Sequence, residues 1–427
     1  MGEGVLTPAF ARLDGALACE GVPLETIAAA VDTPVYVYSA GAIRDQYAAL
    51  DQCLAPVRHR IHYSVKANAN LAILRLLRSL GAGVDIVSGG ELHRALAAGF
   101  RGPDIVFSGV GKTGDELREA LEAGVLLINA ESTGELELLD RVAAGMGVVA
   151  PVALRLNPEV SVDTPHHYTR TGERGSKFGI PMHEAGDAAK LVSGLTHLKL
   201  IGLDMHIGSQ IASVEPYQMG LLRLLELLEH LRRSGARHIR WLDLGGGLSV
   251  SYGGERAMDL ENFAAAVLPS VAASGLSLIV EPGRFLVGNA GVLLSRVLYR
   301  KRSGGRDYAI VDAGMNDLLR PSHYNAFHQV EAVRPRGGLA VIDVVGPVCE
   351  SGDFFAIERE VDDPQAGDLV VIRSAGAYGY VMSSNYNARP RAAEVLVDGD
   401  RFAVVTLRES YGDLTRLEPA DPTWRTV

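Results

Sequence analysis

Residues 61–68, which read IHYSVKAN, predict a buried β-strand that ends at a lysine. Large and β-branched residues alternate along the stretch, and Lys66 stands where the apolar run stops and Asn68 begins a turn. Strand interiors exclude an ammonium group unless it is paired, so the plainer interpretation is that Lys66 reaches into water from the last residue of the strand. The alternative is a Schiff-base lysine, whose neutral amine attacks an aldehyde.

The chain after residue 61 repeats one unit, a short apolar strand followed by a helical segment. Such strands are predicted at residues 61–66, 83–87, 104–108, 125–129, 152–157, 200–207, 239–244 and 276–280. Eight parallel strands that alternate with helices predict a (β/α)8 TIM-type barrel of the α/β class, with the helix at residues 40–54 preceding the first strand. A doubly wound open sheet is the alternative, but the first turn lacks the GxGxxG pattern, which favours the closed barrel.

The sequence after Arg284 changes character and predicts a second, all-β domain. Short β-rich runs separated by Gly, Pro and Asp turns occur at residues 292–299, 308–311, 339–345, 368–372, 393–397 and 402–407. The strand predicted at residues 34–38 is expected to pair with this domain. We therefore predict a barrel domain over residues 40–290 and a β-rich domain built from residues 1–39 with 291–427, which completes the active site.

Composition and charge exclude several classes of function. The 427 residues are 47% hydrophobic and 22% charged, as in a globular enzyme, and the net charge of −10 argues against binding to nucleic acid or to an anionic membrane. No apolar run reaches the roughly 18 residues of a membrane helix, and residues 1–10 show no secretory signal. The three cysteines, Cys19, Cys53 and Cys349, lack metal-binding spacing, so we predict no metal and a reducing, cytoplasmic location.

Unusual residues fall at the predicted carboxyl ends of the strands, where (β/α)8 enzymes place their active sites. Lys66 ends the first strand, His206 the sixth, the glycines at 245–247 follow the seventh, and Glu281 ends the eighth. Each alone has a plainer interpretation: a core histidine, a flexible turn, a strand-end ion pair. Together they supply what pyridoxal phosphate (PLP) requires, namely a Schiff-base amine, an imidazole for the ring face, a phosphate cradle and a carboxylate for the pyridine nitrogen.

At these residues the chain resembles the fold-type III PLP-dependent decarboxylases. The matching segments are residues 63–68 (YSVKAN), 85–91 (DIVSGGE), 177–180 (KFGI), 206–210 (HIGSQ), 245–247 (GGG), 281–284 (EPGR), 312–316 (DAGMN), 320–324 (RPSHY), 349–353 (CESGD) and 377–379 (AYG). The CESGD segment is the most discriminating, and Ser64, where alanine is common, is a small departure. The resemblance implies an alanine-racemase-like barrel with a β-domain, and a head-to-tail homodimer whose active sites are shared across the interface.

The resemblance also implies roles for individual residues. It makes Lys66 the Schiff-base lysine and lets His206 stack on the cofactor ring, while Glu281 meets the pyridine nitrogen. The residues implied around the cofactor phosphate are Ser209, Gly246, Gly247, Gly283, Arg284 and Tyr378.

For the substrate, the resemblance implies a group of contacts at the end far from the cofactor. Arg284, Arg320 and Tyr324, with Tyr378 nearby, would hold a distal carboxylate, and Glu350 a distal ammonium. Cys349 of the partner subunit would donate a proton to the carbanion left by decarboxylation. These residue types suit their tasks, since arginines bind carboxylates with two hydrogen bonds and a thiol can act as an acid. For Cys349, the plainer interpretation is a small buried hydrophobic residue.

The implied reaction is decarboxylation of meso-2,6-diaminopimelate to L-lysine and CO2, the last step of lysine biosynthesis. Alternatives are a related decarboxylase of lysine, ornithine, arginine or a carrier-tethered amino acid, an alanine-racemase-like enzyme, and a non-catalytic PLP-binding protein. Arg320 and Glu350 argue for a substrate with both a carboxylate and an ammonium at its far end. The CESGD segment is not expected in a racemase, and a mere PLP-binding protein leaves the second domain unexplained.

Overall fold

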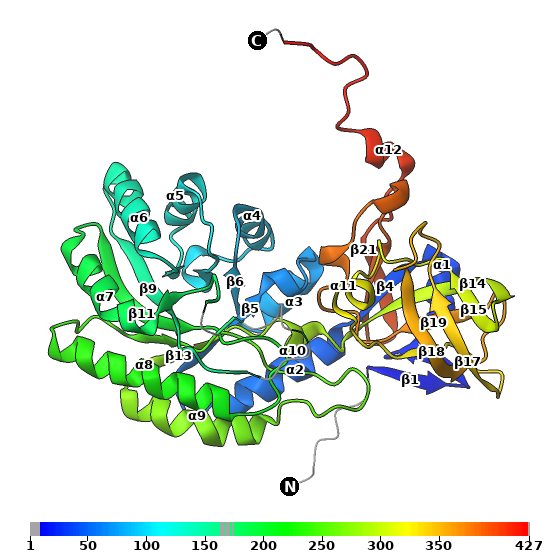
Figure 1. Cartoon of the computed structure of the whole chain (residues 1–427), viewed down its shortest axis with the longest axis horizontal. Coiled ribbons are helices and arrows are strands. Elements are labelled where there is room, and N and C mark those ends of the chain that lie inside the picture. Colours follow the sequence, from blue (N-terminus) through cyan, green and yellow to red (C-terminus); the bar gives the residue numbers. More distant parts are fainter. Residues whose placement is uncertain (1–8, 163–165, 167–170, 173–174, 426–427) are drawn as a thin grey trace. The chain divides into compact units, whose positions relative to one another are not determined.

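The computed structural model describes residues 9–162, 166, 171–172 and 175–425, which form two compact units (Figure 1). Residues 42–288 make one, here called the barrel unit, and residues 1–41 with 289–427 make the other, here called the β unit. The expectation of no secretory signal falls mostly on residues 1–8, outside those described. Among the helices described, none is long and apolar enough to cross a membrane.

A closed ring of parallel strands forms the centre of the barrel unit within the described residues. Its strands are β5 (His59–Ser64), β6 (Gly83–Ile86), β7 (Ile105–Phe107), β8 (Leu127–Ala130), β9 (Ala150–Asn157), β11 (Leu198–Met205), β12 (Trp241–Asp243) and β13 (Ser277–Val280). Neighbours in this order pair in parallel, and β13 returns to pair with β5, which closes the ring. The predicted (β/α)8 barrel is thus confirmed, and the open-sheet alternative is excluded.

Helices alternate with the strands along the chain and surround them, as Figure 1 shows for α4 to α8. They are α2 (Ala40–Leu54), α3 (Leu71–Ser79), α4 (Gly89–Ala97), α5 (Gly114–Ala123), α6 (Thr133–Met146), α7 (Ala185–Gly194), α8 (Glu215–Arg233) and α9 (Leu260–Ser274). Local signals set their ends. The Thr113 and Glu116 side chains form a reciprocal capping box at the start of α5, and Gly124 ends it with φ +67°.

The first strand lies two residues earlier in the chain than predicted. It ends at Ser64, and Val65–Ala67 form a single 3-10 turn, η1, so Lys66 is not a strand residue. The reason is that Ser64 is the last residue that pairs with β6, and its N–H bonds to the Pro282 carbonyl beyond the end of β13. The turn places Lys66 at the carboxyl-end rim of the barrel, where the side chain can bend inward.

The β unit contains one large sheet, with strands ordered β18-β17-β15-β14-β4-β20-β21. The bounds are β1 (Phe10–Leu13), β2 (Ala16–Cys19), β3 (Val22–Pro23), α1 (Leu24–Val31), β4 (Val35–Ser39), β14 (Gly291–Ser303), β15 (Arg306–Val311), β16 (Val330–Ala332), β17 (Leu339–Val345), β18 (Phe354–Asp362), β19 (Leu369–Ile372), β20 (Ala393–Asp398) and β21 (Arg401–Thr406). The N-terminal β4 lies between β14 and β20, antiparallel to the first and parallel to the second. Its Val35 and Val37 pack with Leu294 and Val395 in one apolar core, so the two ends of the chain fold together.

Several elements of the β unit and one short helix of the barrel unit were not predicted. Strand β18 has the sequence FFAIEREVD, which mixes charged and apolar residues, and β16 is three residues long, so neither shows a clear period. The short helices α10 (Arg284–Val287), α11 (Arg320–Tyr324) and α12 (Tyr411–Thr415) have too few turns to show a helical period. Two of these, α10 and α11, begin at arginines predicted to bind ligand.

Candidate active site

Lys66 points at a buried carboxylate, not into bulk water. Its Nζ lies 2.8 Å from Oδ2 of Asp85 in β6, and the Lys66 side chain is about one-third exposed while Asp85 is fully buried. Ser64 Oγ lies 2.8 Å from the same oxygen. The plainer interpretation of Lys66 as a solvated strand end does not describe this arrangement, in which an ion pair with a buried carboxylate holds the partly exposed amine at the rim.

Glu281 directly follows β13 and lies in a cluster of buried carboxyl groups. Carboxyl oxygens of Glu281, Asp204 and Asp243 lie within 4.8 Å of one another. Burial, and then the Asp243 charge, raise the pKa of Glu281 well above its usual value, and burial raises the pKa of Asp243 to about 7. Because like charges this close cannot all ionise in a poorly solvated site, the cluster retains protons near neutral pH.

His206, which follows β11, carries a neutral imidazole. Its Nδ1 accepts the Gly246 N–H at 3.0 Å, so the ring proton sits on Nε2. Burial, with the nearby charges of Arg155 and Lys66, lowers the pKa of His206 well below its usual value. Position 246 requires glycine, because a Cβ there would lie 2.2 Å from the Glu281 carbonyl oxygen.

Hydrogen-bond donors converge from the ends of β11 and β13. Arg284 is buried at the start of α10, donates from Nη1 to the Tyr252 hydroxyl, and has Nη2 3.4 Å from Ser209 Oγ. Gly247 has φ +102°, and a Cβ there would meet the Gly208 carbonyl oxygen at 2.6 Å, so the backbone takes a path closed to other residues. The Gly246 amide is engaged by His206, so its part in phosphate binding stays a prediction.

The sequence analysis assigned no role to the charged residues that support this rim. Arg155, in the middle of β9, pairs with Glu131 at 2.7 Å and approaches Asp204 at 3.8 Å. Asp85 and Asp243 likewise stand within or at the end of otherwise apolar strands. A charged residue inside an apolar strand was the available signal, because a barrel interior accepts such a group only when partners surround it.

Arg320 and Tyr324 lie together in α11 of the β unit. Arg320 is buried, and its guanidinium carbon lies 5.6 Å from the centre of the Tyr324 ring. The Arg320 Nε donates to Nε2 of His328 at 3.4 Å. His328 is fully buried and was not among the predicted site residues.

Cys349 is exposed, which argues against the plainer interpretation of a small buried residue. Its N–H donates to Asn387 Oδ1 at 2.8 Å. Asp353 braces the loop, since its two carboxylate oxygens accept the N–H groups of Met315 and Val348, each at 2.6 Å. The thiol is therefore presented to solvent by a loop that is held at both ends.

The remaining predicted residues of the β unit, Glu350 and Tyr378, are also near its surface. Glu350 is exposed, and its hydrogen bond raises the pKa of the Tyr386 hydroxyl. Tyr378 is half-buried and has φ +55°, a backbone conformation that costs energy for a residue with a side chain.

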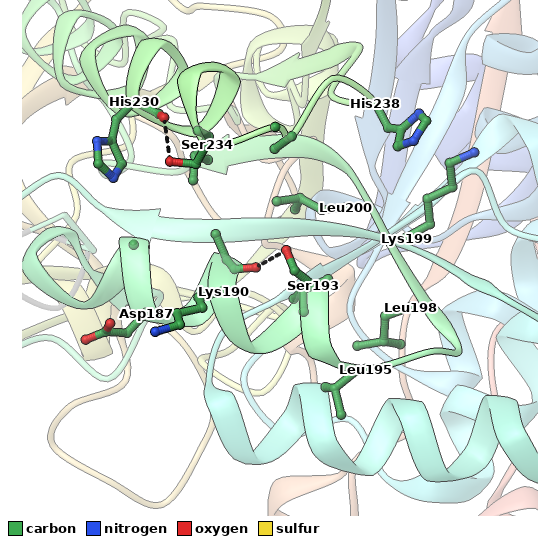
Figure 2. Close-up of a pocket in the computed structure, with 16 residues that line it drawn as sticks. Asp187, Lys190, Ser193, Leu195, Leu198, Lys199, Leu200, His230, Ser234 and His238 are labelled. Atoms are coloured by element: carbon green, nitrogen blue, oxygen red, sulfur yellow. Dashed lines mark hydrogen bonds between the residues drawn. The ribbon is translucent and has the colours of Figure 1, made fainter.

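The predicted residues thus form one set in each unit. Lys66, His206, Ser209, Gly246, Gly247, Glu281, Gly283 and Arg284 belong to the barrel unit, and Arg320, Tyr324, Cys349, Glu350 and Tyr378 belong to the β unit. A separate hollow of about 720 Å³ lies between α7, the start of β11 and the end of α8 (Figure 2). The hollow is lined by Lys190, Lys199, His230 and His238 and lies near the amino end of β11. Because (β/α)8 enzymes place their active sites at the carboxyl ends of the strands, we do not place the active site there.

Comparisons with known proteins relate this chain to pyridoxal-dependent decarboxylases. The family described as "Pyridoxal-dependent decarboxylase, pyridoxal binding domain" matches residues 40–288. A diaminopimelate decarboxylase of Pseudomonas aeruginosa is 50% identical over 406 residues, which are 95% of this chain and 97% of that protein. One of Vibrio cholerae is 45% identical over 411 residues, 96% of this chain and 98% of that protein.

Solved structures agree with these sequence matches. The crystal structure of diaminopimelate decarboxylase from Helicobacter pylori, complexed with L-lysine, has a TM-score of 0.89 at 37% identity and covers 92% of this chain and 99% of its own. That of M. jannaschii, also with L-lysine, has a TM-score of 0.92 at 33% identity, over 97% and 98%. A lysine/ornithine decarboxylase from Vibrio vulnificus, at 22% identity and a TM-score of 0.78 over 88% and 97%, shows only the shared fold.

Proposed function

Because the chain belongs to the pyridoxal-dependent diaminopimelate decarboxylases, we propose that it converts meso-2,6-diaminopimelate to L-lysine and CO2, the last step of lysine biosynthesis. The observation that carries the proposal is the position of Lys66 in the turn η1, just after the end of the first barrel strand. Its Nζ is held 2.8 Å from the buried Asp85 carboxylate, on the rim that also holds Glu281 and His206.

The residues of the barrel rim fit PLP. Lys66 offers an amine for the aldehyde, and the neutral His206 ring can face an aromatic ring without charge repulsion. Arg284 and Ser209 offer donors to a phosphate, with the glycine backbone at 247 and 283 beside them. When bound, PLP supplies an electron sink for the carbanion formed as CO2 leaves.

The buried carboxyl cluster lets the protein stabilise positive charge on the bound cofactor. Burial and the Asp243 charge raise the pKa of Glu281, so a cationic nitrogen beside it would favour the ionised form of Glu281, and that carboxylate would in turn stabilise the cation. Asp85 takes a different part. It holds the Lys66 ammonium at the rim and can receive that amine's proton when Lys66 reacts.

Recognition of the substrate's far end is assigned mainly to residues of the β unit, together with Arg284 of the barrel unit. We assign its carboxylate to Arg320 with Arg284, Tyr324 and Tyr378, and its ammonium to Glu350. What supports this is the pairing of residue types, since Arg320 is a buried, oriented guanidinium and Glu350 an exposed carboxylate. Diamine precursors lack that distal carboxylate, which disfavours the lysine, ornithine and arginine alternatives.

The test of this function is the Arg320→Ala variant. We expect KM for meso-diaminopimelate to rise about tenfold to hundredfold, because one charge-assisted contact to the distal carboxylate is lost, while kcat falls much less. Steady-state CO2 release measures both constants. Arg336→Ala is the matched control, since Arg336 is an exposed arginine of the same unit that pairs with the partly buried Asp368 at 2.6 Å. Unchanged kinetics of Arg320→Ala would remove the basis of the substrate assignment.

We further propose a homodimer in which Cys349 of the partner subunit protonates the carbanion. The support is that Cys349 is exposed on a braced loop, where a second subunit can reach it. A cytoplasmic location fits this role, because a reducing compartment keeps the thiol free.

The Cys349→Ala variant should keep the PLP absorbance but lose about tenfold to hundredfold in kcat, because a positioned acid is removed. Mixing it with Lys66→Ala should restore activity, to about one quarter of wild type when subunits assort at random, since half the dimers are mixed and each has one intact site. Refolding the two variants together and assaying CO2 release measures this. A mixture no more active than Cys349→Ala alone would contradict the shared site, and a fully active Cys349→Ala would refute the proton-donor role.

A further inference from the structure

We infer that His328 is a positioning residue that orients Arg320 toward the distal carboxylate of the substrate, an inference that rests on the proposed function. His328 follows α11 and precedes β16, and none of the roles assigned above includes it. It is fully buried next to the arginine on which substrate choice is argued to depend.

The sheet fixes the His328 ring. Strand β16 pairs with β19 in antiparallel register, and the pairing extends one residue further, where the Arg373 N–H donates to the Gln329 carbonyl at 2.8 Å. This extension brings the Arg373 carbonyl oxygen within 2.8 Å of His328 Nδ1. On the other side, Arg359 of β18 donates to the His328 carbonyl, so both the backbone and the ring of this histidine are held.

These contacts assign the tautomer. A carbonyl oxygen can only accept, so Nδ1 must carry the ring proton, and Nε2 is then an acceptor lone pair. That lone pair faces the Nε–H of Arg320 at 3.4 Å. A second proton on the ring would place a positive charge against a guanidinium, so the neutral form is favoured.

The contacts of His328 and Tyr324 fix the plane of the Arg320 guanidinium. With Nε bound to the imidazole on one edge and the Tyr324 ring 5.6 Å from the guanidinium carbon, the plane is set before a ligand arrives. A carboxylate is then met by the Nη edge, which has the fork geometry that matches two carboxylate oxygens. An arginine without this support would lose rotamer freedom on binding and bind more weakly.

The experiment compares His328→Leu with His328→Gln in the PLP-loaded enzyme. Leucine fills the site without an acceptor, while glutamine retains an amide oxygen near the position of Nε2. We expect His328→Leu to raise KM for meso-diaminopimelate about tenfold with kcat little changed, and His328→Gln to stay within about threefold of wild type. In Arg320→Ala, adding His328→Leu should have almost no further effect on KM.

Two competing ligands separate positioning from general damage. L-lysine, the proposed product, retains the distal carboxylate, and 1,5-diaminopentane lacks it. His328→Leu should weaken inhibition by L-lysine about tenfold and leave inhibition by the diamine unchanged. Equal weakening of both, or wild-type KM in His328→Leu, would overturn the inference.

The proposed function and this inference fail in different ways. A wild-type enzyme that does not release CO2 from meso-diaminopimelate would overturn the function and, with it, the carboxylate assigned to Arg320. An active wild type whose His328→Leu variant behaves like it would overturn the positioning role alone.

Discussion

The Lys66→Ala enzyme is expected to lose at least about 10⁴-fold in kcat and to lose the absorbance of the lysine-bound cofactor. We expect a loss of this size because Lys66 is the nucleophile that forms a covalent bond with the cofactor. The other catalytic residues cannot form that bond in its place. In the structure Lys66 has the geometry for this bond, because η1 turns it inward and Asp85 holds its Nζ at 2.8 Å.

Lys190→Ala is the control for Lys66→Ala. Lys190 is an exposed lysine on α7, on the outside of the barrel (Figure 2), so its loss removes the same charge without touching the rim. CO2 release and absorbance of the purified, PLP-treated proteins measure the result. An active Lys66→Ala enzyme that still binds PLP in its coloured form would show that another amine holds the cofactor.

The Glu281→Gln enzyme is expected to retain PLP and to lose about 10²- to 10³-fold in kcat, the size typical of removing one preorganised electrostatic contact. Glutamine has nearly the shape of glutamate but cannot carry the negative charge that keeps a ring nitrogen protonated. The buried position of Glu281 makes this charge effective, because water does not screen it.

Glu281→Asp separates the charge from the shape. Aspartate keeps the carboxylate but shortens the side chain by one methylene, so we expect it to lose less activity than glutamine. The measurement is kcat for the three proteins at saturating substrate, with bound PLP quantified in each. A Glu281→Gln enzyme as active as wild type would contradict the electron-sink argument, and a loss of PLP alone would assign Glu281 to cofactor binding.

The barrel could be predicted from sequence because its signals are local and repeated. Most strands of the ring contain a short apolar run, and glycines such as Gly124 and Gly275 end the helices in the left-handed conformation. The β unit was harder to predict from sequence. Strand β18 has exposed and buried residues in no regular alternation and mixes glutamates with isoleucine and valine. Its pairing with β17, rather than a pattern in its own sequence, therefore decides its conformation.

The site shows the same division between local and tertiary information. Lys66, His206 and Glu281 could be found because each stands at the end of a strand, where a polar residue interrupts an apolar run. The partnership of Ser64 with Asp85 joins side chains 21 residues apart, and that of His328 with Arg320 joins side chains eight residues apart; both pairs meet only in the folded units. No periodicity carries that information.

The measurement that tests the account most directly is CO2 release by the PLP-loaded wild-type protein offered meso-diaminopimelate, lysine, ornithine and arginine in parallel. We predict strong preference for meso-diaminopimelate, because it alone among the four presents both a carboxylate and an ammonium to Arg320 and Glu350 at the end away from the reacting carbon. Equal or faster release from lysine, ornithine or arginine would contradict the proposed substrate, and release from none of the four would contradict the proposed reaction.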